Sequence, residues 1–417
     1  MKLFVRRVTT EWPSWLAVAF IALLPFGRLS EIPLSAFALA LPLLLRSAAR
    51  RQRLVMAVPL VLPLFLCFWL PMVVSSIDSI DPGKSWSQSL AAVRFLAAAL
   101  SMAALLHPPS TRWRVLRWSA YLLVFWAVDG FIQLVFGADL FGIAMNPDRL
   151  NALFLDKYQF YGPTLAMLSP LLLEYARREW PAWAWAASFT LILGAVMISG
   201  MRSGWLSMAI VLATYILLML QRENRELRRT MATVPVLAAL VIAISYLASP
   251  LFQQRLDLSR ALYEGTEASF DYASSERLPI FTTALSMYRH HPINGVGVRA
   301  FPAAYMIYAQ PDDIHIAKSG GRSGATHAHN VVLEVMSDTG TIGLAGLLLA
   351  VILAARYWLR AGPAQQQDAF PYVLAIGLIL FPLNSHFAVY GTYTSSLVWV
   401  LVGLWAATCR PVAIEQA

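Results

Sequence analysis

Apolar runs of about twenty residues recur from one end of this 417-residue chain to the other. As a helix, a run of roughly 17–25 apolar residues is long enough to cross a hydrocarbon layer about 30 Å thick. Only 13% of the residues are charged, whereas soluble domains contain about 25%. The sequence therefore predicts an all-α, polytopic membrane protein.

Twelve segments qualify as candidate transmembrane helices. They are residues 12–27, 31–46, 54–76, 87–106, 113–136, 158–176, 180–200, 203–220, 232–249, 331–355, 370–388 and 392–409. The pattern divides the chain into nine helices within residues 1–249, one long polar segment at 250–330 and three helices within 331–417. The basic start resembles a signal peptide, but a second apolar run follows at once, so we expect an uncleaved first helix.

Lysine and arginine residues are distributed unevenly between alternate loops. Nineteen lie in the N-terminal segment and the loops expected on its side, five lie in short loops on the other side, and seven lie in 250–330. Cytoplasmic loops are rich in Lys and Arg, and long loops count little in this rule. We therefore expect cytoplasmic termini and a periplasmic loop 250–330, in the inner membrane of a bacterium. This distribution accounts for the net charge of +9 without a nucleic-acid partner.

The long loop has the composition of folded structure. Residues 276–290 predict an amphipathic helix, whose apolar side chains near one face are Leu278, Phe281, Leu285 and Tyr288. Pro279 falls in the first turn, where proline is tolerated, and Pro292 ends the helix. Residues 299–308 predict a second helix. We therefore expect one large helical periplasmic loop.

Five of the seven histidines lie between residues 290 and 329. His329 stands apart because it lies where the polar loop meets the predicted helix 331–355. An ordinary histidine pKa of about 6.5 suits proton transfer near neutral pH, although a polar surface explains most of the other histidines. His327 and His329 also suggest a metal site, but no third ligand is placed beside them. We expect no metal.

The residues after His329 have structural interpretations of their own. Asn330 suits the N-cap of the helix that follows it. Gly340 and Gly343, three residues apart on one helix face, suit close packing against a neighbouring helix, as small residues do in membranes. Both interpretations are compatible with a functional His329.

Arginines outside the cytoplasmic loops are candidates for ligand binding. Arg202 lies between two predicted transmembrane helices, and Arg277 begins the loop helix; Arg289 and Arg299 follow in the same loop. Burying a cationic side chain in the bilayer costs free energy, so such residues are often functional. The structural alternative is an arginine that extends its charge to the interface, or one that forms a surface ion pair. Convergent arginines bind phosphate groups by bidentate hydrogen bonds.

Two polar side chains fall inside predicted transmembrane helices. His386, with Asn384, lies in 370–388, and Asp129 lies in 113–136. A buried polar contact between helices is the plain interpretation of each, and His386 is also a candidate for support of the site.

The pattern of His329, Asn330, nine residues, Gly340, two residues and Gly343 resembles the signature of the O-antigen ligase family. That family lies in a superfamily with O-antigen polymerases and bacterial O-oligosaccharyltransferases. The segment His291–Gly297 and the residues around Arg202 and Arg277 resemble it further.

The resemblance implies a membrane glycosyltransferase that moves an O-antigen glycan from undecaprenyl pyrophosphate to a hydroxyl of lipid A–core, at the periplasmic face. It implies no metal or nucleotide cofactor. His329 would be the general base, and Arg202 and Arg277 would bind the pyrophosphate. A single displacement would invert the anomeric centre. From their positions, the supporting candidates are Arg299, Arg289, His327, Asn330 and His386.

Three alternatives remain open. A polymerase of the same superfamily usually has two sizeable outward loops, whereas 137–157 is short here. A protein O-oligosaccharyltransferase typically adds a large C-terminal outward region, whereas eight residues follow the last predicted helix. A transporter or flippase would place charges near the midplane, where Arg94 and Asp129 are the candidates. The loops and the His329 pattern favour the ligase.

Overall fold

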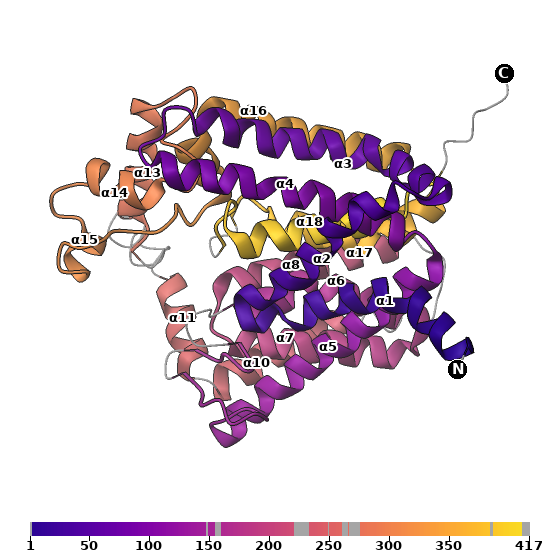
Figure 1. Cartoon of the computed structure of the whole chain (residues 1–417). Coiled ribbons are helices and arrows are strands. Elements are labelled where there is room, and N and C mark those ends of the chain that lie inside the picture. Colours follow the sequence, from indigo (N-terminus) through magenta and orange to yellow (C-terminus); the bar gives the residue numbers. More distant parts are fainter. Residues whose placement is uncertain are drawn as a thin grey trace. The chain divides into compact units, whose positions relative to one another are not determined.

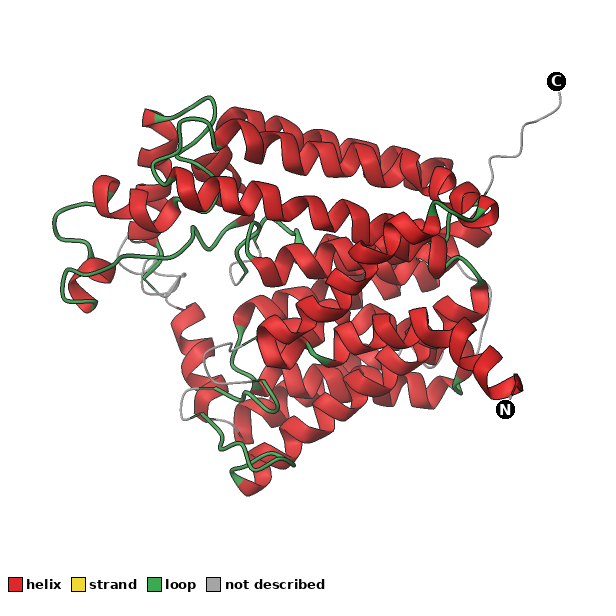
Figure 2. Cartoon of the chain, viewed as in Figure 1, coloured by secondary structure: helices red, strands yellow, loops and turns green. Residues whose placement is uncertain are grey.

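The computed structural model describes residues 2–146, 149–154, 160–220, 233–248, 250–260, 266, 276–383 and 387–410. Within these residues the regular structure is helical and no β-strand is present (Figures 1 and 2). The predicted all-α class is therefore confirmed. The chain forms two compact units: unit 1 contains Met1–Ile32, Ser110–Glu264 and Leu374–Leu378, and unit 2 contains Pro33–Pro109, Gly265–Val373 and Ile379–Ala417.

Unit 1 is built from helices of both the N-terminal and central parts of the chain. They are α1 (Lys2–Ala22), a 3₁₀ segment (Leu24–Ser30), α5 (Pro109–Phe136), α6 (Tyr161–Glu179), α7 (Ala182–Ile198), α8 (Arg202–Leu220), α10 (Val234–Ala248) and α11 (Pro250–Arg260). Helix α6 packs against α7 and α8, and α7 packs against α10. In α5, the buried Asp129 accepts a hydrogen bond from the Leu140 N–H at 3.0 Å and so anchors the loop that follows.

Unit 2 contains the helices on either side of the long loop. They are α2 (Glu31–Leu44, from Pro33 onward), α3 (Ala48–Ser75), α4 (Pro82–Leu105), α13 (Leu278–His290), α14 (Phe301–Tyr308), α15 (Ile314–Lys318), α16 (Val331–Arg360) and α18 (Thr392–Ala406). Helix α3 packs against α4 and α16 (Figure 1). A Cβ atom at Gly346 of α16 would collide with the Cys67 carbonyl oxygen of α3, so this glycine permits close backbone contact.

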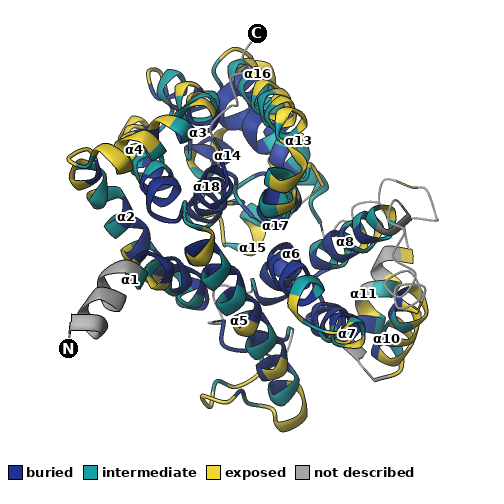
Figure 3. Cartoon of the chain, turned by 90° about the vertical axis from the view of Figure 1, so that its right-hand side faces the viewer, coloured by how far each residue is buried: buried dark blue, intermediate teal, exposed yellow. Residues whose placement is uncertain are grey.

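Each of the twelve predicted transmembrane segments overlaps a helix. Among the described residues, five helical segments are long and apolar enough to cross a membrane: Leu24–Leu45, Ala48–Ser75, Pro82–Leu105, Pro109–Phe136 and Val331–Arg360. Four shorter apolar helices accompany them. Many residues of α16 are exposed (Figure 3). Large apolar residues are among them, as in a helix in contact with lipid. The number of membrane crossings stays a prediction.

Two boundaries differ from those expected from the sequence. Helix α17 (Pro363–Ile379) begins earlier than the predicted 370–388 because proline is favoured in a first turn, and it ends before Pro382, which disfavours continuation. The loop helix α13 (Leu278–His290) begins two residues later than the predicted 276–290, because Pro279 is favoured in its first turn. Its buried face also differs from the predicted one. Its buried residues are Ile280, Thr283, Ala284 and Met287.

Candidate active site

The loop segment 291–297 fills a break in α16. Four backbone hydrogen bonds join the two: Thr341 N–H to Pro292 O at 2.8 Å, Ile342 N–H to Ile293 O at 3.1 Å, Val296 N–H to Ser337 O at 2.8 Å and Gly297 N–H to Asp338 O at 3.1 Å. They lie on both sides of Gly340, where the helical conformation is interrupted. The two segments that carry the family resemblance are therefore hydrogen-bonded to each other.

Glycine is required on both sides of this junction. Gly340 has φ 64° and ψ −157°, a conformation that is essentially restricted to glycine, and a Cβ atom there would collide with the backbone of Ile293. Gly295 has φ 72°, and its Cβ atom would collide with the backbone of Asp338. The prediction that Gly340 and Gly343 lie on one continuous helix face is therefore wrong, because Gly340 breaks the helix. A Cβ atom at Gly343 would meet the side chain of Thr339.

Asn330 fixes the start of α16. Its side-chain oxygen accepts hydrogen bonds from Val332 N–H and Leu333 N–H, both at 3.0 Å. It is the N-cap that the sequence predicts. His329 precedes it with a left-handed backbone, φ 51°, which is uncommon for residues other than glycine. The position of the histidine is therefore set by a specific local backbone.

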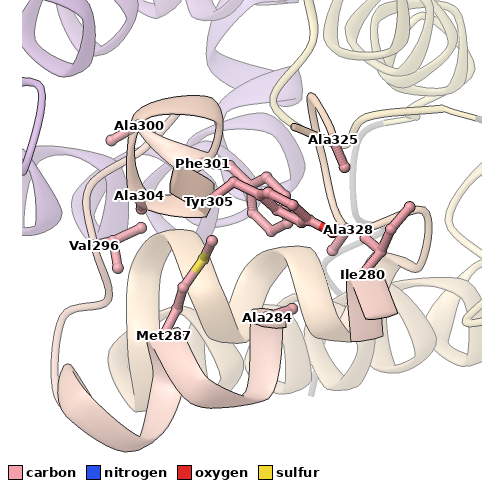
Figure 4. Close-up of a cluster of buried hydrophobic side chains, with 10 residues drawn as sticks. All are labelled: Ile280, Ala284, Met287, Val296, Ala300, Phe301, Ala304, Tyr305, Ala325 and Ala328. Atoms are coloured by element: carbon pink, nitrogen blue, oxygen red, sulfur yellow. The ribbon is translucent and has the colours of Figure 1, made fainter. Parts of the chain in front are cut away.

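A small hydrophobic core holds the histidine segment. Ala328 is fully buried in it. Its other members are Ile280, Ala284, Met287, Val296, Ala300, Phe301, Ala304, Tyr305 and Ala325 (Figure 4). Burial also raises the pKa of the Tyr305 phenol, whose hydroxyl donates to Asp313 at 2.8 Å. Ala328 thus anchors the segment between two half-buried histidines.

The rings of His327 and His329 lie against each other, with centroids 3.8 Å apart. The other loop histidines have structural contacts. A ring nitrogen of His290 bonds with Ser286 O at 2.8 Å, one of His291 with the Tyr308 hydroxyl at 2.8 Å, and one of His315 with Glu276 O at 2.7 Å. Within the described residues, no group of three His, Cys, Asp or Glu side chains is arranged to hold a metal ion.

Two acidic residues, Glu334 and Asp338, lie buried in the first part of α16, each 1% exposed. Asp338 accepts a hydrogen bond from Arg299 N–H at 2.9 Å, and Glu334 accepts one from Tyr390 N–H at 3.3 Å. The second carboxylate oxygen of Glu334 is buried without a hydrogen-bond partner in the part of the chain that the structure describes. Their spacing of four residues puts both on one helix face, and acidic residues within a membrane helix are a functional signal. The sequence interpretation overlooked both.

The three arginines of the loop occupy different positions. Arg277 is the N-cap residue of α13, and Arg289 is exposed in its last turn. Twelve residues of helix separate their backbones by about 18 Å along the axis, so they lie at opposite ends of α13. Arg299 has a left-handed backbone, φ 63°, and its charge interacts with both Glu334 and Asp338. Arg299 is therefore the arginine tied to the buried acids.

Three further predicted residues belong to other segments of the chain. Arg202 is the first residue of α8 in unit 1, two residues after Gly200, which has a left-handed backbone, φ 70°. A Cβ atom at Gly162 would collide with Ser199, so α6 packs closely against the end of α7. This contact lies three residues before Arg202 in the sequence. His386 and Asn384 lie outside the described residues.

Comparison with known proteins relates one part of the chain to a family. A family model described as O-antigen ligase matches residues 187–348. The matched segment includes Arg202, Arg277 and His329, the three residues that the resemblance assigns to the reaction. No curated protein matches the chain. Members of this family are membrane enzymes that act on glycans, and the apolar helices agree with a multi-pass membrane protein. Residues 187–348 are therefore an O-antigen ligase family domain, which confirms the resemblance carried by the His329 pattern.

Proposed function

We propose that this protein is an O-antigen ligase of the bacterial inner membrane. It transfers an O-antigen glycan from undecaprenyl pyrophosphate to a hydroxyl of lipid A–core at the periplasmic face. The observation that carries the proposal is the family match over residues 187–348, together with the way the loop and α16 hold His329. The hydrogen-bonded junction at Gly340 and the buried Ala328 support a fixed position for this histidine.

In this proposal His329 acts as the general base. A sugar hydroxyl is a weak nucleophile, and a positioned base accelerates its attack by about 10²–10⁴-fold. The hydroxyl oxygen bonds to the anomeric carbon, its proton passes to His329, and the bond to the pyrophosphate oxygen breaks. Negative charge then develops on the pyrophosphate, which Arg202 and Arg277 stabilise by charge-assisted hydrogen bonds. His327, Asn330, Arg289, Arg299 and His386 are proposed in support, with Asn330 acting through the helix cap.

Reconstituted transfer tests the proposal. The purified full-length protein receives undecaprenyl pyrophosphate-linked glycan and lipid A–core, and the products are separated and their anomeric configuration is determined by NMR. A ligase yields glycan on lipid A–core with inverted configuration. Lengthening of the lipid-linked glycan, with none on lipid A–core, would identify a polymerase. Retained configuration would contradict the single displacement.

Replacing Arg202 or Arg277 by alanine is expected to raise the KM for the lipid-linked donor about tenfold. Each variant loses one charge-assisted hydrogen-bonding group, and a loss of about 1.4 kcal/mol in binding free energy corresponds to a tenfold change. Lysine at either position restores only part of the effect, because an ammonium group cannot form the bidentate contact. Steady-state kinetics with varied donor measure this. Arg260→Ala is the control, because Arg260 is exposed and paired with Asp257. A KM equal to that of the control would remove the residue from donor binding.

Replacing Asp338 by alanine is expected to lower kcat about 10- to 100-fold, since it leaves Arg299 N–H without its acceptor and small displacements in a site are costly. Asp338→Asn keeps a side-chain oxygen and should lose less. Asp312→Ala, which removes an exposed carboxylate from the same loop, is the control. Equal kcat in Asp338→Ala and Asp312→Ala would show that the acid does not support the site.

A further inference from the structure

A cavity of about 840 Å³ lies in unit 2 at the C-terminal end of α16. Its walls come from the middle of α3, the last two turns of α16, the first turn of α17 and Arg410. The His329 segment precedes the other end of α16, so this cavity is separate from the candidate active site.

One wall of the cavity is apolar. On α3 it presents Pro59, Pro63 and Leu64, and on α16 it presents Leu353. Proline has no backbone N–H, so this face of α3 lacks two backbone donors. Tyr357 adds an aromatic wall, which its hydroxyl fixes by donating to Cys409 Sγ at 2.7 Å. The wall suits hydrocarbon rather than a small hydrophilic ion.

The rim of the same cavity is basic. Arg356 and Arg360 are four residues apart and so lie on one helix face, and both are exposed. Arg410 faces Asp368 at 3.7 Å. Among the described residues, neither Arg356 nor Arg360 takes part in an ion pair. Positive charge therefore exceeds negative charge at the rim.

The position along α16 places the rim at a membrane boundary. From the break at Gly340 to Arg356 and Arg360 the helix rises about 24–30 Å, which is close to the thickness of a hydrocarbon core, about 30 Å. Exposed apolar side chains occupy the interval; they include Leu348, Leu349, Val351 and Ile352. Both α3 and α16 are candidate membrane spans.

We propose that this cavity binds one anionic glycerophospholipid from the leaflet at this end of α16. Its phosphate contacts Arg356 and Arg360, and the upper parts of its acyl chains lie along the proline and leucine wall of α3. Basic pockets between membrane helices bind anionic headgroups, and a volume of 840 Å³ falls in the range of ligand pockets, about 300–1,000 Å³. The site is independent of the proposed transfer reaction.

Native mass spectrometry of the full-length protein tests this site. The protein is released from nanodiscs that contain equal amounts of phosphatidylglycerol and phosphatidylcholine. We expect one bound phosphatidylglycerol per chain in preference to phosphatidylcholine. The double variant Arg356→Gln with Arg360→Gln should lower that preference about tenfold or more, because each basic residue near a lipid surface contributes roughly 1 kcal/mol. Glycerol 3-phosphate, added in excess, should not displace the lipid.

Two further variants separate the cavity from general surface charge. Arg50→Gln with Arg51→Gln removes the same charge from an exposed pair in the first turn of α3 and should leave the preference unchanged. Leu353→Trp places a bulky ring in the apolar part of the cavity without changing charge, and it should weaken binding of phosphatidylglycerol. Equal binding of the two lipids by the wild type, or equal losses in both arginine pairs, would overturn the proposal. Displacement by glycerol 3-phosphate would instead identify a site for a free phosphate ester.

Discussion

Replacing His329 by alanine is expected to lower the rate of glycan transfer to lipid A–core by about 10²–10⁴-fold, the contribution of a positioned general base. The acceptor hydroxyl then has no group to receive its proton, while the arginines that bind the donor remain. The fall should therefore appear in kcat, with little change in the KM for the donor. Initial rates of the reconstituted reaction, at saturating donor and acceptor, measure it.

The backbone at His329 calls for a second variant and a control. Asparagine tolerates the left-handed conformation better than most residues, and His329 has φ 51°, so His329→Asn removes the base with little added strain. It should lose as much activity as His329→Ala. His290→Ala, which removes an exposed loop histidine bonded to Ser286, should keep the wild-type rate. Full activity in His329→Asn would exclude a general base at this position and would reopen the transporter alternative.

The helical class follows directly from the apolar runs, since a long run has no way to satisfy its backbone in lipid except as a helix. Residues that interrupt helices, such as Pro382 after α17, explain where helices end. The face of α13 was the exception. Its Phe281 and Tyr288 are the large apolar residues, but Ile280, Ala284 and Met287 are the ones that are buried. A pattern of size and polarity does not reveal which face meets Ala328 and Phe301, because that core is formed by residues from distant positions.

The residue types of the candidate site could be predicted from the sequence, but most of the contacts between distant segments could not. The cap at Asn330 is a local interaction, so the sequence was sufficient for it. The break at Gly340 depends on the loop segment 291–297, some fifty residues earlier, and spacing alone suggested a continuous helix. Glu334 and Asp338 stood in the sequence as two acids within an apolar run. Their connection to the loop and to the segment before α18 depends on hydrogen bonds from Arg299 N–H and Tyr390 N–H, which the sequence does not reveal.

Replacing Gly340 by alanine is expected to destabilise the protein by about 2–6 kcal/mol. A residue other than glycine is strained at φ 64° and ψ −157°, at a cost of about 1–3 kcal/mol. A Cβ atom would also collide with the backbone of Ile293 and Asn294, and such overpacking costs about 1–3 kcal/mol more. Thermal unfolding of the purified protein in detergent, followed by circular dichroism, measures the change.

Gly320→Ala provides the matched control for this prediction. Gly320 also has a positive φ, 68°, but nothing lies within 4 Å of the position of its Cβ atom, so only backbone strain of about 1–2 kcal/mol is added. The difference between the two variants therefore reports mainly the contact of α16 with the loop segment 291–297. Gly340→Ala should also reduce transfer in the fraction that remains folded, because the junction follows His329 by only eleven residues. If the two variants unfolded at the same temperature, the loop would not be packed into the break, and the fixed position of His329 would lose its principal support.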